Sequence, residues 1–281
     1  MFQRTRFAWQ RIAASIEHSP KKRRMFHAGF LCLNLATLYG AVNYLRETKH
    51  RAIGGKQLPN KFEVKAHNTE PVYNSIAEDY DDRINREELM SYIWLMRKKV
   101  CKNLHGDCLE VSCGTMRNLP YISKYLRSNQ IQSLTFVDPS EQMLAVGKQK
   151  FVDSDLSTKV PAQFVKGRAE DLGVLCESSN QKFDTVFETF GLCSHEDPVA
   201  ALHAMADVLK PKGKIVLLEH GKGDWAMINN HLDRKAEKRA EEWGCRWNLD
   251  LDSIIEQSKL KVVQRKKYHF GTSKLYILEK E

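Results

Sequence analysis

One short stretch constrains the fold of this chain more than any other: Cys108-Leu-Glu-Val-Ser-Cys-Gly-Thr-Met116. Cys108 to Val111 have strand character, the small residues after them predict a turn, and Asn118 to Leu126 can form a helix. A second strand, Leu134 to Asp138, follows and ends on an acid. Strand, small-residue turn, helix, strand and acid together are the layout of a nucleoside-binding βαβ unit.

The turn and the second acid suit a nucleoside for physical reasons. Small residues let the backbone approach a ligand closely, and a carboxylate at the end of the second strand, Asp138, can accept hydrogen bonds from ribose hydroxyls. The stretch is not the dinucleotide fingerprint G-x-G-x-x-G, because it reads E-x-S-x-G-x-M from Glu110 to Met116. An ordinary βα turn in an α/β domain is the alternative.

This stretch resembles motif I of class I S-adenosylmethionine (SAM) methyltransferases, usually written E/D-x-G-x-G-x-G. Gly114 matches one of the three glycine positions, whereas Ser112 and Met116 occupy the other two. The resemblance implies that Glu110, Ser112, Gly114 and Asp138 bind SAM.

Two further stretches are similar to this class. Tyr73-Asn-Ser-Ile-Ala-Glu-Asp-Tyr-Asp81 resembles the Y-x-x-x-A-x-x-Y-D helix that closes over the SAM site, which implies a cofactor-binding role for Tyr73 and Tyr80. Asp138-Pro-Ser-Glu-Gln-Met-Leu144 resembles the D-x-S-x-x-M-L helix start of the ubiquinone/menaquinone methyltransferase type. Both stretches lie where the family has them relative to motif I.

A third predicted strand, Ala162 to Lys166, leads into the loop Gly167-Arg-Ala-Glu-Asp-Leu172. This loop resembles the D-A-E-D-L loop that contacts adenine in the family, but Arg168 replaces the first acid. The resemblance therefore implies adenine recognition by the backbone near Ala169 and by Glu170.

The strand Phe183 to Glu188 matches motif IV, F-D-x-V, and Thr189 follows at its carboxyl end, where α/β sheets bind ligands. Lys210 to Gly213 resembles the family's turn into the fifth strand. The remaining expected elements are helices at Val72–Asp81, Glu87–Leu104, Val199–Leu209, Asn230–Trp243 and Asp250–Ser258, and strands at Lys261–Lys266 and Lys274–Leu278. The order of these matches implies an α/β fold, the seven-stranded Rossmann-like sandwich of class I methyltransferases.

The C-terminal third carries a narrower resemblance. Its stretches are similar to a fungal group of mitochondrial inner-membrane methyltransferases and to the related methyltransferase-like membrane proteins of animals. They are Glu219-His-Gly221, Trp243-Gly-Cys-Arg-Trp-Asn248 and His269-Phe-Gly-Thr272.

Positive charge is concentrated at the N-terminus. Residues 1–66 hold 13 of the 44 basic residues and 3 of the 35 acidic ones, which leaves residues 67–281 close to neutral. A near-neutral domain argues against nucleic acid as a partner. Residues 1–24 are rich in Arg and poor in acids, as in a mitochondrial presequence; the alternative is a cytosolic basic flank of a membrane anchor.

Residues 25–45 carry no charged side chain and are bracketed by Arg24 and Arg46. A helix of this length would be about 31 Å long, close to the thickness of the hydrocarbon core, and predicts a single membrane span. Its small residues suit a helix partner in the bilayer. A soluble amphipathic helix is the rival. We expect residues 46–70 to be a linker, residues 71–281 the SAM-dependent methyltransferase domain, and the mitochondrial inner membrane the location, with orientation open.

The seven cysteines suggest neither a metal site nor a disulfide framework, because none lies in a Cys-x-x-Cys pair. We expect them to be scattered, buried or partly buried thiols. No metal is expected, and the resemblance implies SAM as the cofactor.

Methyl transfer needs an acceptor held in line with the methyl group, and a base where the acceptor must lose a proton. His220, just beyond the fifth strand, is the predicted base, with Glu219 as the acid that orients it; the alternative is a solvated loop histidine. The favoured function is a membrane-anchored SAM-dependent methyltransferase for a small or lipophilic acceptor, quinone-like or lipid-like.

Two other functions are weighed. A membrane-bound mitochondrial assembly factor with a degenerate methyltransferase fold is the alternative, and Met116 and Arg168 favour it. An RNA methyltransferase fits less well, since the domain lacks basic surplus and an N-P-P-Y-type tetrapeptide after the fourth strand.

Overall fold

The computed structural model describes most of the chain from residue 64 onward, namely residues 64–128, 130–177 and 181–280. They belong to a single compact unit, Phe62–Glu281. The predicted presequence, the predicted span and most of the predicted linker lie outside the described residues. Within the described part of the chain, none of the helices combines the length and the apolar character needed to cross a bilayer.

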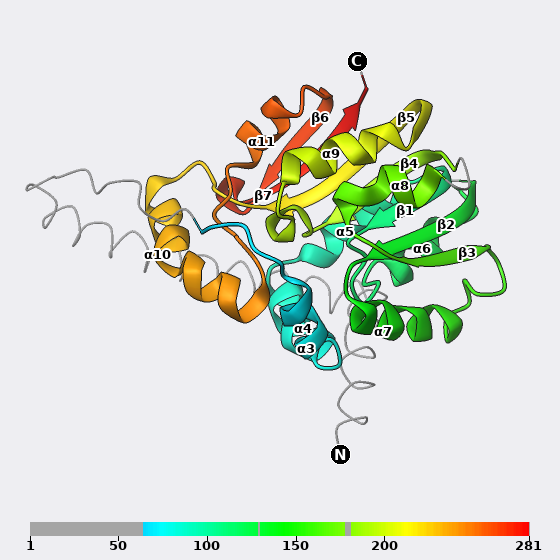
Figure 1. The fold of residues 1–281 in the computed structure, drawn as a ribbon, viewed down its shortest axis with the longest axis horizontal. Coiled ribbons are helices and arrows are strands. Elements are labelled where there is room, and N and C mark those ends of the chain that lie inside the picture. Colours follow the sequence, from blue (N-terminus) through cyan, green and yellow to red (C-terminus); the bar gives the residue numbers. More distant parts are fainter. Residues whose placement is uncertain (1–63, 129, 178–180, 281) are drawn as a thin grey trace, which may run out of the picture. The chain divides into compact units, whose positions relative to one another are not determined.

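A seven-stranded sheet with the strand order β3-β2-β1-β4-β5-β7-β6 forms the centre of the domain (Figure 1). Neighbouring strands from β3 to β5 are parallel, and β7 runs antiparallel to both β5 and β6. The strands are β1 (Gly106–Val111), β2 (Ile131–Asp138), β3 (Ala162–Lys166), β4 (Phe183–Thr189), β5 (Leu209–His220), β6 (Lys261–Tyr268) and β7 (Ser273–Glu279). This confirms the seven-stranded Rossmann-like sandwich.

The strand order reverses between β1 and β4. From β1 the chain continues to β2 and β3 on one side, whereas β4 and β5 extend the sheet on the other. In open α/β sheets ligands bind beyond the carboxyl ends of the strands at such a switch point, because the connecting helices diverge there. Glu110 and Thr189, near the ends of β1 and β4, therefore lie where a ligand is expected.

Each face of the sheet is covered by helices, and alternate strand residues supply the two cores. Phe136, Phe187 and Val216 pack in one core with apolar residues of α5 (Ile93–Cys101), α6 (Leu119–Tyr125) and α7 (Glu141–Val152). Val186 and Leu217 pack in the other with α8 (Leu172–Glu177), α9 (Pro198–Asp207) and α11 (Leu251–Gln257). Parallel strands buried on both faces explain the long apolar runs of the sequence.

A third, smaller cluster joins α3 (Glu70–Ile76), the start of α4 (Tyr80–Met90), α7 and the end of α10 (Ala226–Trp243). Ile76, Ala77 and Met143 are its buried members. Tyr80 and Trp243 pack against the cluster, and their two rings meet edge to face. This cluster connects segments that are distant in the sequence and builds a wall beside the carboxyl edge of the sheet.

Two predicted helices are interrupted. The helix expected over Val72–Asp81 is divided between α3, which ends at Ile76, and α4, which begins at Tyr80. The continuous helix expected over Glu87–Leu104 is split into α4 and α5, because Tyr92 adopts a left-handed conformation with φ of 56°. His269 lies against the break, with its Nε2 atom 2.8 Å from the carbonyl oxygen of Ser91. Within α5, Arg97 is buried.

Candidate functional site

Every second residue of the motif I turn, from Ser112 to Met116, has a left-handed backbone conformation. Ser112, Gly114 and Met116 have φ values of 50°, 52° and 56°, all in the left-handed region that glycine adopts most readily. These are the three positions at which the resembled motif has glycine. The turn therefore keeps the motif's backbone conformation although two of its three glycines are replaced.

Met116 points into the core rather than into the site. Its side chain is 1% exposed and lies against α7 at Gly147, where an added Cβ would come within 2.8 Å of the Met116 Cγ atom. The bare α7 backbone thus makes room for the methionine that replaces a glycine. Met116 is thus packed into the core beside the turn.

Asp138 holds the turn in place. Its Oδ2 atom accepts a hydrogen bond of 2.7 Å from the Gly114 amide, and Oδ1 accepts one of 2.9 Å from the Ser140 amide. Burial raises the pKa of Asp138 to about 6. Each oxygen keeps a further acceptor site, so the carboxylate can still receive a ribose hydroxyl.

Glu110 is a buried carboxyl group with one oxygen in use. Its Oε1 atom accepts a hydrogen bond of 2.7 Å from Asn118 Nδ2, whereas Oε2 is buried and has no hydrogen-bond partner among the described residues. Burial raises the pKa of Glu110 to about 7. A buried acceptor without a partner is costly in a finished site and indicates a place for a ligand donor or cation.

Acids stand near the carboxyl ends of four adjacent strands. Glu188 of β4 resembles Glu110: Oε1 lies 2.7 Å from His195 Nε2, and Oε2 is buried without a partner among the described residues. Glu219 of β5 is fully buried, and both its oxygens accept from backbone amides. Burial and the neighbouring Glu188 raise the pKa of Glu219 well above its usual value, which favours its neutral form. Negative charge near neutral pH can come from Asp138 and Glu110, whose pKa values are raised to about 6 and about 7. SAM carries a sulfonium and an ammonium group, so the residues present fit it.

A buried arginine links the motif to β4. Arg97 Nη1 donates to Asn118 Oδ1 at 3.0 Å and to Thr189 Oγ1 at 2.8 Å, and Asn118 Nδ2 also lies 3.0 Å from that hydroxyl. Glu88 binds Arg97 in a bidentate pair with distances of 2.7 and 3.2 Å. Thr189, a predicted site residue, is thus held by the same network that holds Glu110.

A second ion-pair group ties α4 to the turn. Asp81 accepts from Thr115 Oγ1 at 2.7 Å and from Arg117 Nη1 at 2.9 Å, and it also pairs with Lys150 of α7. Although burial opposes ionisation, Lys150 and Arg117 lower the pKa of Asp81 to about 2. Asp81 is the last residue of the Y-x-x-x-A-x-x-Y-D stretch, so the resemblance correctly placed this helix beside motif I.

Sequence reasoning missed Arg97, Glu88 and Asn118. Both Arg97 and Glu88 lie in the single helix expected over Glu87–Leu104, whose apolar residues at helical spacing indicate core packing and give no sign of a buried ion pair. The position of Asn118 could have predicted its role. A polar residue directly after a ligand-binding turn is placed to contact the preceding strand.

The loop after β3 is partly engaged with its own neighbours. Ala169 is buried at the start of a short 3₁₀ turn, Ala169–Asp171. Glu170 Oε1 accepts from the Asp197 amide at 3.3 Å and lies 3.3 Å from Arg168 Nη2. Arg168, which stands in place of an acid, therefore neutralises the neighbouring acid that was expected to contact adenine.

A pocket opens beside the switch point. Counted together with the open space at its mouth, it has a volume of about 520 Å³. Its walls combine four aromatic residues with apolar, charged and sulfur-containing ones: Tyr73, Tyr80, Phe190 and Trp243, together with Ile84, Ile93, Glu87, Glu88, Cys193, His220, Arg239 and Cys245. Tyr73 is held by its hydroxyl, 2.7 Å from Ser194 Oγ. The two tyrosines expected at the cofactor thus line this pocket.

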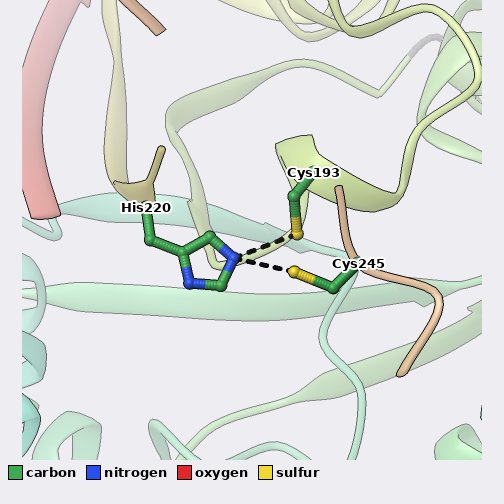
Figure 2. A group of neighbouring side chains, drawn as sticks. All are labelled: Cys193, His220 and Cys245. Atoms are coloured by element: carbon green, nitrogen blue, oxygen red, sulfur yellow. Dashed lines mark hydrogen bonds between the residues drawn. The ribbon is translucent and has the colours of Figure 1, made fainter. Parts of the chain in front are cut away.

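His220 reaches the pocket, but its contacts differ from those expected. Its Nε2 atom lies 3.3 Å from Cys193 Sγ and 3.0 Å from Cys245 Sγ (Figure 2). Glu219 is the preceding strand residue, so its side chain points to the opposite face of the sheet and binds the amides of Gly191 and Leu192. The expectation that Glu219 orients His220 is therefore corrected.

Comparison with known proteins agrees with the fold and the motifs. The sequence profile of the ubiE/COQ5 methyltransferase family matches residues 61–237. The chain is 45% identical over 224 residues to the mitochondrial methyltransferase OMS1 of Saccharomyces cerevisiae. The aligned part covers 76% of this chain and 46% of OMS1. It is 33% identical over 160 residues to a demethylmenaquinone methyltransferase of Staphylococcus haemolyticus, covering 56% of this chain and 62% of that protein.

A solved structure gives the same architecture. The O-methyltransferase NcsB1 from neocarzinostatin biosynthesis, in complex with S-adenosyl-L-homocysteine (SAH) and 1,4-dihydroxy-2-naphthoic acid, is similar with a TM-score of 0.54 at 17% identity. The match covers 74% of this chain and 59% of that chain. The chain thus spans less than half of OMS1 and about three fifths of the staphylococcal relative. With the family profile matched over most of its length and the sheet order in agreement, this chain belongs to the ubiE/COQ5 family of SAM-dependent methyltransferases.

Proposed function

We propose that the chain transfers a methyl group from SAM to a small lipophilic acceptor, quinone-like or lipid-like, in the pocket beside the switch point. The observation that carries this proposal is the set of four aromatic residues in the pocket wall, of which Phe190 directly follows β4. An aromatic wall binds flat or apolar molecules and excludes water, which would otherwise compete with the acceptor.

Residues at the ends of different strands would bind different parts of SAM. When bound, SAM supplies a methyl group on a sulfonium, which is a good leaving group. Asp138 would accept the ribose hydroxyls, the backbone at Ser112 and Gly114 would approach the amino-acid end, and Ala169 and Glu170 would border the adenine. The unpartnered Glu110 oxygen would meet a positive group of the cofactor.

Aromatic residues of the pocket would hold the acceptor and orient it. Tyr80 and Trp243 form an edge-to-face pair with ring centroids 6.3 Å apart, and Phe190 stands 5.3 Å from the His220 ring. Fixed aromatic faces restrict the acceptor to a few orientations and place its reacting atom toward the sheet edge. The predicted role of His220 as the base that takes the acceptor's proton stays a prediction.

Relatives support the acceptor class. The staphylococcal relative is named a demethylmenaquinone methyltransferase, and NcsB1 was crystallised with a dihydroxynaphthoic acid. Both names refer to fused-ring aromatic molecules, which match the aromatic pocket wall of this chain.

Radiolabelled methyl transfer tests the proposal. The full chain is incubated with methyl-labelled SAM and either hydroxylated naphthoquinone precursors or phospholipid vesicles, and label is counted in the organic phase. Label should appear in an acceptor, and Trp243→Ala should raise KM for it. The matched control Trp225→Ala changes an exposed tryptophan outside the pocket and should leave KM unchanged.

The outcome separates the two candidate functions. Label transfer that is insensitive to Trp243→Ala would contradict the acceptor site. A folded chain that binds no SAM and transfers no label would favour the assembly-factor function instead.

We also propose that the chain is mitochondrial and anchored in the inner membrane by residues 25–45. The support is the uncharged run bracketed by basic residues and the mitochondrial relative OMS1. After alkaline carbonate extraction the intact chain should stay in the membrane fraction, and deletion of residues 25–45 should release it. Extraction of the intact chain as a peripheral protein would contradict the span.

A further inference from the structure

Three side chains with metal-binding atoms meet in the pocket wall, from three separate segments. Cys193 lies in the short 3₁₀ turn after β4, His220 is the last residue of β5, and Cys245 follows α10. The sulfur atoms and the nearer ring nitrogen all lie within 4.8 Å of one another. Figure 2 shows the two thiols directed at the same nitrogen of the imidazole.

Hydrogen bonding alone explains this arrangement poorly. A neutral imidazole offers one lone pair at Nε2, and thiols are weak donors, yet two sulfurs lie 3.3 and 3.0 Å from that single atom. A bound cation would satisfy all three groups at once. Around a tetrahedral zinc ion, a sulfur and a nitrogen ligand are about 3.6 Å apart. The two nitrogen–sulfur distances would lengthen by about 0.3 and about 0.6 Å to reach that value.

The chemistry of the three groups points to zinc. Two thiolates and an imidazole are the ligands that Zn²⁺ prefers, and the two thiolate charges would neutralise the ion in a buried place. Cys193 and Cys245 are 1% and 4% exposed. The Arg246 guanidinium fixes the backbone of the Cys193 turn, because its Nε donates to the Cys193 carbonyl oxygen at 3.3 Å.

We propose that Cys193, His220 and Cys245 bind one Zn²⁺ ion whose fourth position faces the pocket. All three residues line the pocket, so a molecule there can reach the open position. Two thiolates and one imidazole with a fourth site for water or substrate is a ligand set of catalytic zinc sites. That this fourth position takes a donor atom of the methyl acceptor rests on the function proposed above; the binding of the metal does not.

The proposal gives His220 a different role from the one expected of it. A base needs a free lone pair on Nε2, and a metal ligand uses that lone pair. The two roles are therefore alternatives. With zinc bound, the acceptor atom would lose its proton to solvent at the open mouth of the pocket, because the metal would lower the pKa of a coordinated group.

Metal titration tests the site directly. The full chain is purified with a reductant, stripped of metal with a chelator and titrated with Zn²⁺ against a chromophoric competitor, then with Co²⁺. We expect one ion per chain. The cobalt form should show thiolate-to-metal charge-transfer bands and the intense visible bands of tetrahedral coordination.

Matched variants assign the ligands. Cys193→Ser, Cys245→Ser and His220→Gln should each weaken Zn²⁺ binding by about 100-fold or more, since even partners behind the ligands are worth about 10–100-fold. Cys176→Ala changes a buried cysteine of α8 away from this group and should bind within about twofold of the unchanged chain. Circular dichroism on every variant identifies those that remain folded, and the cobalt spectrum of the unchanged chain does not depend on them.

Three results would overturn the proposal. They are failure to bind one ion per chain, binding that is equal in the ligand variants and in Cys176→Ala, and a Cys193–Cys245 disulfide that persists in the reduced preparation. The two proposals also fail separately. Zinc binding without methyl transfer removes the proposed function and keeps the site, whereas methyl transfer by a chain that binds no zinc does the reverse.

Discussion

At the scale of single residues, the most informative departure from the family is Met116. It keeps the left-handed backbone of a glycine position and sends its side chain into the core. A methionine can do this because it is unbranched and flexible, and because α7 presents the bare Gly147 to it. A substitution that looks disabling in the sequence is thus compatible with the turn.

We predict that Met116→Gly separates stability from cofactor binding. Removing a fully buried side chain leaves a cavity and should lower the free energy of unfolding by about 2 kcal/mol or more, after relief of left-handed strain. SAM affinity should change by less than about tenfold, equal to about 1.4 kcal/mol. Urea unfolding and calorimetry measure the two effects, and a gain in affinity from undetectable to micromolar would show that Met116 blocks the cofactor.

Glu110 makes the site sensitive to pH. Its pKa is raised by burial from 4.5 to about 7, so the folded chain holds this proton more tightly than the unfolded chain. The stability from the protonated group is fully present below about pH 4.5 and is lost as the pH rises through about 7. A cation such as SAM prefers the ionised carboxylate, so its affinity should rise over the same range.

We predict that SAM binding near pH 6.5 releases protons. Calorimetry in two buffers of different ionisation enthalpy detects that release. Glu110→Gln, which keeps the size of the side chain and cannot ionise, should reduce the release and flatten the pH dependence of affinity. Proton uptake on binding, or an unchanged profile in Glu110→Gln, would contradict a role for Glu110 beside a positive group.

At the scale of elements, α4 and α5 are fastened to the motif I turn by buried charges. Although burial acts against it, Arg97 and Arg117 lower the pKa of Glu88 to about 2, so this acid is ionised at any ordinary pH. Arg97 in turn connects to Asn118 and Thr189. One network of buried ion pairs and hydrogen bonds therefore joins α4 and α5 to the strands that end at the switch point.

We predict that Arg97→Met destabilises the fold strongly. Removing one partner of a buried ion pair leaves Glu88 partly uncompensated and should cost about 3–5 kcal/mol in urea unfolding. Arg265→Met removes an exposed arginine paired with Asp252 and should cost about 1 kcal/mol or less. A loss at Arg97 as small as the loss at Arg265 would mean that this network is not structural.

Elements were predictable where local pattern decides them. Ala162–Lys166 is a strand with the expected bounds, and the apolar runs that end at Asp138 and Glu188 are buried strands. The break at Tyr92 was not predictable, because the helical pattern continues through it and a distant contact, that of His269 with Ser91, lies against the break.

At the scale of the whole molecule, the sequence did not predict which side chains from distant segments meet in the site. The motifs along the first half of the domain indicated the cofactor side, since each belongs to a single strand and its following turn. Cys193, His220 and Cys245 meet only after β4, β5 and α10 have packed. No spacing in the sequence resembles a metal motif, so the group became visible only in three dimensions.

The membrane segment belongs to this scale as well. The predicted span at residues 25–45 lies outside the described residues, and the pocket lies in the described domain. A membrane anchor would suit a lipophilic acceptor, because an anchored domain meets an acceptor dissolved in the membrane at a high local concentration.

The most direct test of the account is a calorimetric titration of SAM into the full chain beside Asp138→Ala. Asp138 supports the turn and would accept the ribose hydroxyls, and charge-assisted hydrogen bonds are worth about 1.5–3 kcal/mol each. We predict one SAM per chain, affinity about tenfold weaker or more in Asp138→Ala, and no change in the exposed control Asp153→Ala. A folded chain that binds no SAM, or equal affinity in both variants, would contradict the account.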